Sequence, residues 1–445
     1  MHFLGVDIGT SATKAVVIDE DLKIVAQATS DTYEVEMPHP TWAQQEANVW
    51  LKGFMQAVSK VMKEDFDVRA LCVSGLYGGS GIPLSKEMEP LGPALIWMDK
   101  RAKEETKWVK EKIGADRLFD ITGNYVDPYF GFTKILWLKK HHPSWKEISL
   151  LLSPKDYVIY KITGRIATDY SSAGNIGGVF DIHEKKWSDE MISELGLRKT
   201  LFVEEILSSD EMVGGLAKEY ADLLGLKSGT PVICGGIDAA VATYACGVEK
   251  TGQNVAMIGT SMCWGTIHEG EHLTPKMVNM PYVIEPQRYV YSFGGATTAG
   301  AVVEWFKREF ASDLTFEELE KKAREAGEDY GGIKVEPYFM GERAPIWNPD
   351  LRGSIKGLTL STTKFHIYGA ILKSIADSLK LNVETAKQNN IPLDDEIFVV
   401  GGVSGSKLLL DMIRESTGMR VKTLATSLDA PIGDAKLAKR WFEGK

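Results

Sequence analysis

Two short turns of this chain share the residues Ile-Gly-Thr-Ser, at positions 8–11 and again at 258–261. Glycine lets a backbone approach a ligand closely, and N–H groups exposed at such turns bind anions, so each turn suits a phosphate. An acidic residue, Asp7, precedes the first copy, whereas Met257 stands at the matching place of the second. We therefore expect two phosphate turns, of which only the first also holds a hydrated Mg²⁺, because this cation takes only one or two protein carboxylates.

Two further stretches, 235–238 and 401–406, also place small residues directly after an apolar strand pattern. A single Gly-Thr-Ser turn is most often a plain hairpin, because Gly and Ser are ordinary turn formers. The sequence also contains no Walker-type GxxxxGKS or GxxxxGKT loop. The prediction of a phosphate site therefore depends on the conjunction of all four turns.

Asp238 follows the apolar segment PVICGG and precedes an alanine-rich helical pattern. It thus stands at the carboxyl end of an expected strand, where α/β folds place ligands. A carboxylate at that point could accept the proton of a hydroxyl that attacks a γ-phosphate. An aspartate before a helix also suits an N-cap, and the residue types alone leave both roles open.

One motif points to different chemistry. The segment HEGEH (268–272) fits the H-E-x-x-H pattern of zinc proteases, which needs both histidines on one face of a helix. A glycine lies between the two histidines, and the preceding residues have a strand pattern. We therefore expect a polar turn here.

The elements that must position these residues alternate between strands and helices, which indicates an α/β fold. The expected strands are 3–7, 14–19, 24–29, 70–79, 254–258, 262–268, 289–293 and 396–402, and the expected helices are 47–64, 101–113, 131–141, 214–226, 297–310 and 366–388. Because the strand-turn-strand pattern restarts with the second Ile-Gly-Thr-Ser, we expect two related domains with a boundary near 245–253.

Composition argues against several classes of protein. The chain has 445 residues, 44% hydrophobic and 25% charged, with a net charge of −10, so neither nucleic acid nor an anionic membrane is an expected partner. Its four cysteines are widely spaced without a CxxC pair, which predicts free thiols in a reducing compartment. The N-terminal sequence has no signal-peptide pattern and 232–248 carries an aspartate and glycines, so we expect a cytoplasmic protein.

The sequence resembles the FGGY carbohydrate kinases of the actin/Hsp70/hexokinase-like superfamily over nearly its whole length. The segments YFGFTKILWLKKHHP (129–143) and GSIKGLTLSTTKFHIYGAILKSIADSL (353–379) look like the two family signatures. KDYVIYKITGRIATDYSSA, GTPVICGGIDAA and PYFMGERAPIWNP are similar to further family blocks. The resemblance implies two ribonuclease H-like α/β domains. Residues 1–247 would form the domain with the sugar site, and residues 248–445 the domain with the nucleotide site. The two domains would close on ATP and on a sugar held in the cleft between them.

The resemblance also implies roles for matching residues. Asp7 would hold Mg²⁺ and Asp238 would be the catalytic base. The residues implied around ATP are Gly9, Thr10, Ser11, Lys14, Gly259, Thr260, Gly300, Gly402 and Ser406. The implied sugar contacts, besides Asp238, are Tyr77, Trp97, Asp99 and Arg101. For the last three, a core tryptophan and a structural ion pair remain the alternatives.

The substrate is less defined than the reaction. Xylulokinases usually carry Met-His where this chain has Tyr77 and Gly78, and Asn where it has Ala239, while the Arg-Glu of glycerol kinases is also absent. The implied sugar contacts offer acceptors for hydroxyl groups and aromatic faces, which suit a neutral ketopentose such as xylulose or ribulose. The alternative substrate is another polyol, ketose or sugar acid, such as glycerol or gluconate. A non-catalytic sugar- and ATP-binding protein would need Asp7 or Asp238 replaced. The expected assembly is a homodimer.

Overall fold

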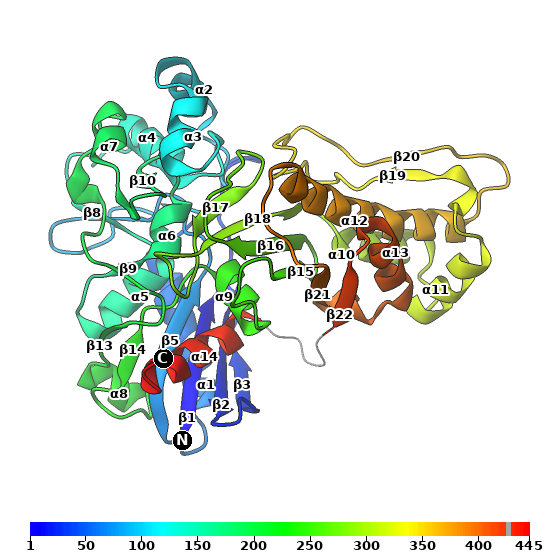
Figure 1. Ribbon diagram of the computed structural model, residues 1–445. Helices are drawn as coiled ribbons and strands as arrows, with labels where there is room; N and C mark the ends of the chain where they lie inside the picture. The colour runs from blue at the N-terminus through cyan, green and yellow to red at the C-terminus, as the bar shows by residue number, and fades with distance from the viewer. Residues whose placement is uncertain (424–428) are drawn as a thin grey trace. The chain divides into compact units, whose positions relative to one another are not determined.

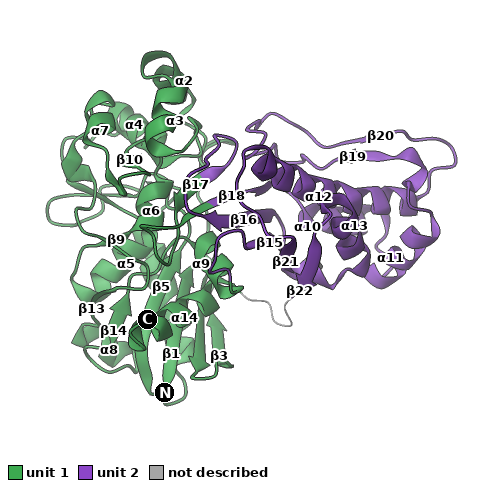
Figure 2. Cartoon of the chain, viewed as in Figure 1, with its two compact units in different colours: residues 1–247, 279–291, 429–445 green, residues 248–278, 292–428 purple. Residues whose placement is uncertain are grey.

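The computed structural model describes residues 1–423 and 429–445 (Figure 1). These residues form two compact units (Figure 2). Unit 1 contains residues 1–247, 279–291 and 429–445, and unit 2 contains 248–278 and the described part of 292–428. The chain leaves unit 1 after residue 247 but returns to it twice. The two sequence domains, 1–247 and 248–445, stay a prediction, and the compact units are divided differently from them.

Unit 1 is built on a six-stranded sheet with the order β13-β14-β5-β1-β2-β3. Its strands are β1 (His2–Ile8), β2 (Thr13–Asp19), β3 (Ile24–Thr29), β5 (Val68–Gly75), β13 (Met212–Gly215) and β14 (Pro231–Ile233). β1 pairs antiparallel with β2 across the first Ile-Gly-Thr-Ser turn and parallel with β5, which is parallel to β14. The carboxyl ends of β1, β5 and β14 therefore meet at one edge of the sheet.

Helices cover this sheet through apolar side chains. In α1 (Ala47–Val61), Trp50 and Phe54 lie four residues apart and are buried in the unit 1 core. The last helix, α14 (Ala430–Phe442), packs on β1 so closely that a Cβ added at Gly5 would lie 1.9 Å from the Pro431 carbonyl oxygen. The remaining helices are α2 (Lys103–Lys112), α3 (Ala115–Thr122), α4 (Gly131–His141), α5 (Pro154–Thr163), α6 (Tyr170–Asn175), α7 (Asp189–Glu194), α8 (Lys218–Leu224) and α9 (Asp238–Ala245).

Short strand pairs and one 3₁₀ turn complete unit 1. The pairs are β4 (Gln44–Gln45) with β7 (Ala94–Leu95), β6 (Ile82–Leu84) with β8 (Leu150–Leu152), β9 (Thr168–Asp169) with β12 (Ile206–Leu207), and β10 (Phe180–Asp181) with β11 (Lys186–Trp187). The 3₁₀ turn is η1 (Lys199–Leu201). The expected helix 214–226 is shorter in the structure, because residues 212–215 pair with β14 as an edge strand.

Unit 2 repeats the same plan on a second sheet, in which β18, β16, β15, β21 and β22 are successive neighbours. β15 pairs antiparallel with β16 across the second Ile-Gly-Thr-Ser turn and parallel with β21. The strands are β15 (Asn254–Ile258), β16 (Met262–His268), β18 (Val290–Ala296), β21 (Glu396–Val400) and β22 (Arg420–Thr423), and β17 (Val278–Pro281) lies where the chain passes back to unit 1. Two sheet-centred α/β units are thus present, as the alternating pattern predicted.

The helices of unit 2 are α10 (Gly300–Phe310), α11 (Phe316–Glu325), α12 (Lys364–Gln388) and α13 (Lys407–Thr417), with 3₁₀ turns η2 (Tyr330–Gly332) and η3 (Gly402–Gly405) and the strand pair β19 (Lys334–Glu336) and β20 (Ser354–Lys356). α12 buries one face in the unit 2 core, where Ile371, Ile375 and Leu379 recur at helical spacing. Across the ranges 1–423 and 429–445, no helix combines the length and the apolar character that a bilayer crossing requires.

The HEGEH segment does not form a helix. β16 ends at His268, which is buried with its Nε2 atom 2.7 Å from Ser292 Oγ, and His272 is exposed in a bend. Within the described residues there is no group of three or more His, Cys, Asp or Glu side chains that could hold a metal ion. All four cysteines are free thiols.

Candidate active site

The carboxylates of Asp7 and Asp238 approach one another at the carboxyl edge of the unit 1 sheet. Asp7 lies near the end of β1 opposite Ser74 of β5, and Asp238 follows the turn after β14. Ile237 forms a bridge with Gly75 at the end of β5, which brings the turn up to the same edge. Burial first, and then the negative charge of Asp238, raise the pKa of Asp7 to about 7. Because burial and a neighbouring negative charge both disfavour the charged form of Asp7, a nearby cation would favour it.

Asp238 is the first residue of α9 and not its N-cap. Ile237 occupies the N-cap position and makes no side-chain capping bond. The Asp238 Oδ1 atom accepts a hydrogen bond of 2.7 Å from the Ala239 backbone N–H. The side chain is therefore anchored through one oxygen at the sheet edge, and the capping alternative does not describe it.

Hydrogen bonds from side chains of unit 1 stabilise the conformation of the first Ile-Gly-Thr-Ser turn. Tyr33 Oη donates to the Gly9 carbonyl at 2.7 Å, and Gln45 Nε2 donates to the Thr10 carbonyl at 2.8 Å. Trp97 Nε1 donates to Thr10 Oγ1 at 3.1 Å, while Ser11 is exposed. These bonds restrain the backbone of the turn at Gly9 and Thr10.

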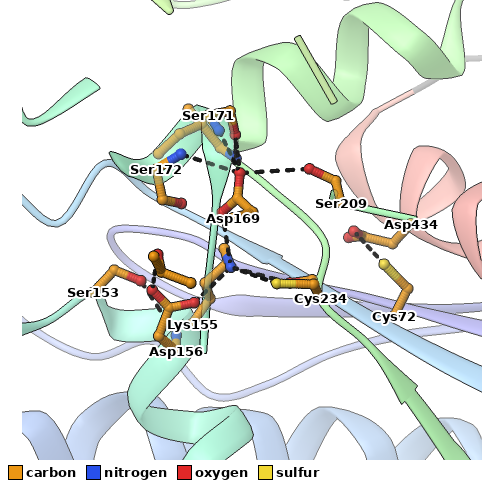
Figure 3. A network of polar contacts seen from close by, with 12 residues as sticks. Cys72, Ser153, Lys155, Asp156, Asp169, Ser171, Ser172, Ser209, Cys234 and Asp434 are labelled. Atoms are coloured by element: carbon orange, nitrogen blue, oxygen red, sulfur yellow. Dashed lines mark hydrogen bonds and ion pairs between the residues drawn. The ribbon is translucent and has the colours of Figure 1, made fainter. Parts of the chain in front are cut away.

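Two acidic residues of the chain's last segment join this site, and the sequence analysis missed both. Asp429 Oδ2 lies 3.1 Å from Lys14 Nζ. Asp434 is fully buried, accepts a hydrogen bond of 2.6 Å from Ser74 Oγ and contacts Cys72 (Figure 3). Burial raises the pKa of Asp434 well above its usual range. In the sequence, these two residues are noticeable only as acidic residues of the segment 429–434. No local pattern indicates that this segment lies against β1.

The predicted sugar contacts are arranged more tightly than the sequence suggested. Asp99 accepts hydrogen bonds from the Ala43 N–H at 2.7 Å and from Arg101 Nε at 2.8 Å. The Arg101 guanidinium also lies over the ring of Trp42, 4.1 Å from its centroid, and donates to Gln44. The Asp99 side chain is 0% exposed and that of Arg101 3%, which is the geometry of a structural pair. A direct contact of either residue with a sugar stays a prediction.

Tyr77 and Trp97 differ in accessibility. Tyr77 is buried, and its hydroxyl accepts a hydrogen bond from the Gly131 N–H. The cavity that it lines measures about 30 Å³, which is enough for a water molecule but not for a sugar. Trp97 is only partly buried and contacts Thr10 through its indole nitrogen, so it links the expected sugar loop with the phosphate turn.

Unit 2 contains a large cavity of about 1390 Å³. It is lined by all five residues of this unit that were predicted to bind ATP, namely Gly259, Thr260, Gly300, Gly402 and Ser406. The second Ile-Gly-Thr-Ser turn is fixed to the start of α10, because the Gly300 N–H donates to the Gly259 carbonyl at 2.9 Å. Ser406 caps α13 by accepting from the Leu409 N–H at 3.1 Å. Glycine turns and a helix start thus surround a cavity large enough for a nucleotide.

The turn that carries Asp238 depends on one glycine. Gly235 has a φ of +62°, and a Cβ added there would lie 2.0 Å from the Val73 carbonyl oxygen. Gly229 offers a matched control, since its φ is +81° but nothing lies within 4 Å of an added Cβ. Gly229→Ala is expected to cost about 1–2 kcal/mol of unfolding free energy for its left-handed backbone. Gly235→Ala is expected to cost about 3 kcal/mol or more, because β5 must also move.

Thermal unfolding of the two alanine variants and the wild type checks this prediction. Equal losses of stability in both variants would show that the close approach to β5 does not restrain the turn.

Two models of known families match the chain. The model described as FGGY family of carbohydrate kinases, N-terminal domain, matches residues 2–245, and that of the C-terminal domain matches residues 254–440. A xylulose kinase of Staphylococcus xylosus is 26% identical over 99% of this chain and 92% of its own length. A gluconokinase of Bacillus licheniformis is 26% identical over 85% of this chain and 75% of its own length. The crystal structure of a ligand-bound xylulose kinase from Lactobacillus acidophilus has the same fold, with a TM-score of 0.92, 23% identity and coverage of 100% of this chain and 90% of that one.

Proposed function

Because this chain belongs to the FGGY family of carbohydrate kinases, we propose that it transfers the γ-phosphate of ATP to a terminal hydroxyl of a ketopentose, xylulose or ribulose. Family membership makes it a phosphotransferase with ATP as the phosphate donor, as the motifs predicted. The observation that carries the proposal for the site is the meeting of Asp7, Asp238 and the Gly9–Thr10–Ser11 turn at one edge of the unit 1 sheet.

Asp238 is proposed as the general base. Its Oδ1 atom accepts a hydrogen bond from the Ala239 N–H, which orients the carboxylate at the carboxyl edge of the sheet, where it would accept the proton of the sugar hydroxyl. The oxygen of the sugar hydroxyl then forms a bond with the γ-phosphorus. At the same time the bond from this phosphorus to the bridging oxygen of ATP breaks, and ADP leaves. General bases of this kind typically contribute about 10²–10⁴-fold to the rate.

The donor set at this edge fits a hydrated Mg²⁺. Magnesium prefers oxygen ligands, keeps several waters and needs only one or two carboxylates, so a cluster of three acidic residues is not required. Asp7 would hold it, because burial and then the negative charge of Asp238 raise the pKa of Asp7, and a bound divalent cation would offset both effects. When bound, Mg²⁺ neutralises charge that develops on the phosphate oxygens.

The remaining ATP contacts are assigned by position. Thr10, Ser11 and Lys14 extend from the first turn and would bind phosphate oxygens through hydroxyl and ammonium groups. In unit 2, the cavity bounded by Gly259, Thr260, Gly300, Gly402 and Ser406 would hold the rest of the nucleotide. Its glycines keep side chains out of the space that the ligand needs.

A neutral ketopentose is favoured by two observations. The S. xylosus relative named as a xylulose kinase matches nearly the whole chain. In addition, the Arg101 guanidinium is already occupied by Asp99, Gln44 and the ring of Trp42, so it does not supply a counter-charge for a sugar acid.

Steady-state assays over a sugar panel test the substrate. We expect kcat/KM for xylulose or ribulose to exceed that for glycerol and gluconate by about 10²-fold or more, because a pocket built to bind each hydroxyl is left with unpaired groups by the wrong ligand. ADP release without sugar serves as the background. If glycerol or gluconate were the best substrate, the proposal of a ketopentose as substrate would be wrong, and the assignment as a kinase would stand.

A further inference from the structure

A buried polar network lies beneath the turn that carries Asp238, and Lys155 is at its centre (Figure 3). The Lys155 side chain is 2% exposed. Its Nζ atom lies 2.6 Å from Asp156 Oδ1, 2.9 Å from Asp169 Oδ2 and 3.0 Å from the Cys234 carbonyl oxygen. The contacts with Asp156 and the Cys234 carbonyl are hydrogen bonds, and the contact with Asp169 Oδ2 is an ion pair. The lysine therefore joins two acidic residues to the backbone where β14 ends.

Asp169 connects Lys155 with the other end of the turn. Its Oδ1 atom accepts hydrogen bonds from the Ser171 and Ser172 N–H groups at 2.8 and 3.1 Å and from the Ser171 hydroxyl. Because Ser171 Oγ donates its proton to Asp169, it is left as an acceptor, and the Ile237 N–H donates to it at 3.0 Å. The chain of contacts thus runs from Lys155 through Asp169 and Ser171 to the residue directly before Asp238.

The turn is therefore held at both ends by the same network. Lys155 binds the Cys234 carbonyl, and Ser171 binds the Ile237 N–H. Between them, the Gly235 N–H donates to the Ser209 carbonyl at 2.9 Å, and the Gly236 carbonyl accepts from the Gly75 N–H at 3.2 Å. Each residue from 234 to 237 thus makes at least one backbone hydrogen bond to a partner outside the turn, which restrains the backbone before Asp238.

We propose that Lys155, Asp169 and Ser171 are positioning residues, which fix the backbone before Asp238 so that its carboxylate meets the reacting hydroxyl. This inference rests on the proposed role of Asp238 as the base. None of the three side chains needs to touch either substrate. Breaking the network lets the turn relax, and a displacement of about 1 Å at a reacting group costs about 10²-fold in rate.

Ser171→Ala is the sharpest test, since it removes one hydroxyl and leaves the Lys155–Asp169 ion pair intact. We expect kcat to fall by about 10–100-fold, with KM for the sugar and for ATP changed less than about twofold, because the variant misplaces a group that acts in the transition state. Ser171→Thr keeps the hydroxyl and is expected to retain most of kcat. An unchanged kcat in Ser171→Ala would overturn the proposal.

Ser172→Ala is the matched control. Ser172 is the next residue of the same helix and also donates its N–H to Asp169, but its buried hydroxyl has no hydrogen-bond partner among the described residues. This variant is expected to leave kcat and both KM values unchanged. If it lowered kcat as much as Ser171→Ala does, general loosening of α6 would explain both effects and the proposal would be wrong.

A double-mutant cycle separates positioning from a structural role. If Ser171 acts through Asp238, Ser171→Ala has no further effect on kcat once Asp238→Asn is present, whereas a structural role lowers kcat by the same factor in both backgrounds. Should Ser171→Ala fail to unfold cooperatively, Ser171→Cys, which fills the same space with a weaker acceptor, takes its place in the cycle. An Asp238→Asn protein with wild-type kcat would instead contradict the proposed function, so the two failures are distinct.

Discussion

Asp238→Asn is expected to lower kcat by about 10²–10⁴-fold, because the amide cannot accept the proton of the attacking hydroxyl. Asparagine keeps an oxygen that can accept the Ala239 N–H, so the start of α9 is expected to remain in place. Asp238 does not line the unit 2 cavity that is proposed to hold ATP, so the affinity for ATP is expected to be unchanged. Steady-state rates under saturating sugar and ATP, together with a direct nucleotide titration, measure both quantities.

Asp222→Asn provides the control for this variant. Asp222 is an exposed aspartate of α8 whose contact is an ion pair with Lys218, so its loss is expected to leave kcat unchanged. Near wild-type turnover in Asp238→Asn would remove Asp238 from the role of base.

Asp7→Asn is expected to have the second largest effect, on the magnesium dependence of the rate. The amide lacks the negative charge that would hold the cation. The Mg²⁺ concentration for half-maximal rate is therefore expected to rise by at least about 10–100-fold. This is the range found when a group that only supports a metal ligand is replaced, and a direct ligand should matter at least as much. Because asparagine has nearly the same shape as aspartate, the thermal unfolding midpoint is expected to change little. Rates measured across a magnesium titration at fixed ATP check the prediction.

Asp434→Asn is a closely matched control for Asp7→Asn. Both carboxyl groups are hydrogen-bond partners of the Ser74 hydroxyl, but Asp434 is fully buried, and this burial raises its pKa well above the usual range and so disfavours its charged form. Its neutral replacement is expected to leave the magnesium requirement as it is in the wild type. An unchanged magnesium dependence in Asp7→Asn would contradict the metal assignment, and loss of folding would indicate a structural role for Asp7.

Several parts of the site could be predicted because their signals are local. The strand before Asp7, the glycine turn after it and the repeat of that turn at 258–261 all lie within a few residues, and hydrophobic pattern and turn chemistry act over that distance. The position of Asp238 after an apolar strand was also predicted correctly, although the structure places it inside the helix and not at the cap.

The partners of these residues could not be predicted in the same way. Lys14 and Asp429 are separated by 415 positions, and Ser74 and Asp434 by 360. No local pattern relates such residues, since the contact exists only because α14 returns to pack on β1. The same holds for Asp99 and Arg101, which were predicted as sugar contacts with a structural pair as the alternative, because only the structure shows that they are buried and paired with each other, and their contact with a sugar stays a prediction.

The sequence by itself determined that the chain forms alternating strands and helices, that an Ile-Gly-Thr-Ser turn is repeated and that the family is that of the FGGY kinases, because each of these depends on short contiguous patterns. Only the tertiary structure decided which side chains surround those turns. Strand order brings β14, β5 and β1 together, and so places Asp238 at the same sheet edge as Asp7, with Lys155 bound to the start of the turn that leads to Asp238. The physical reason is that the carboxyl edge of a sheet is assembled from segments distant in the chain, so the neighbours of each carboxylate are set by packing.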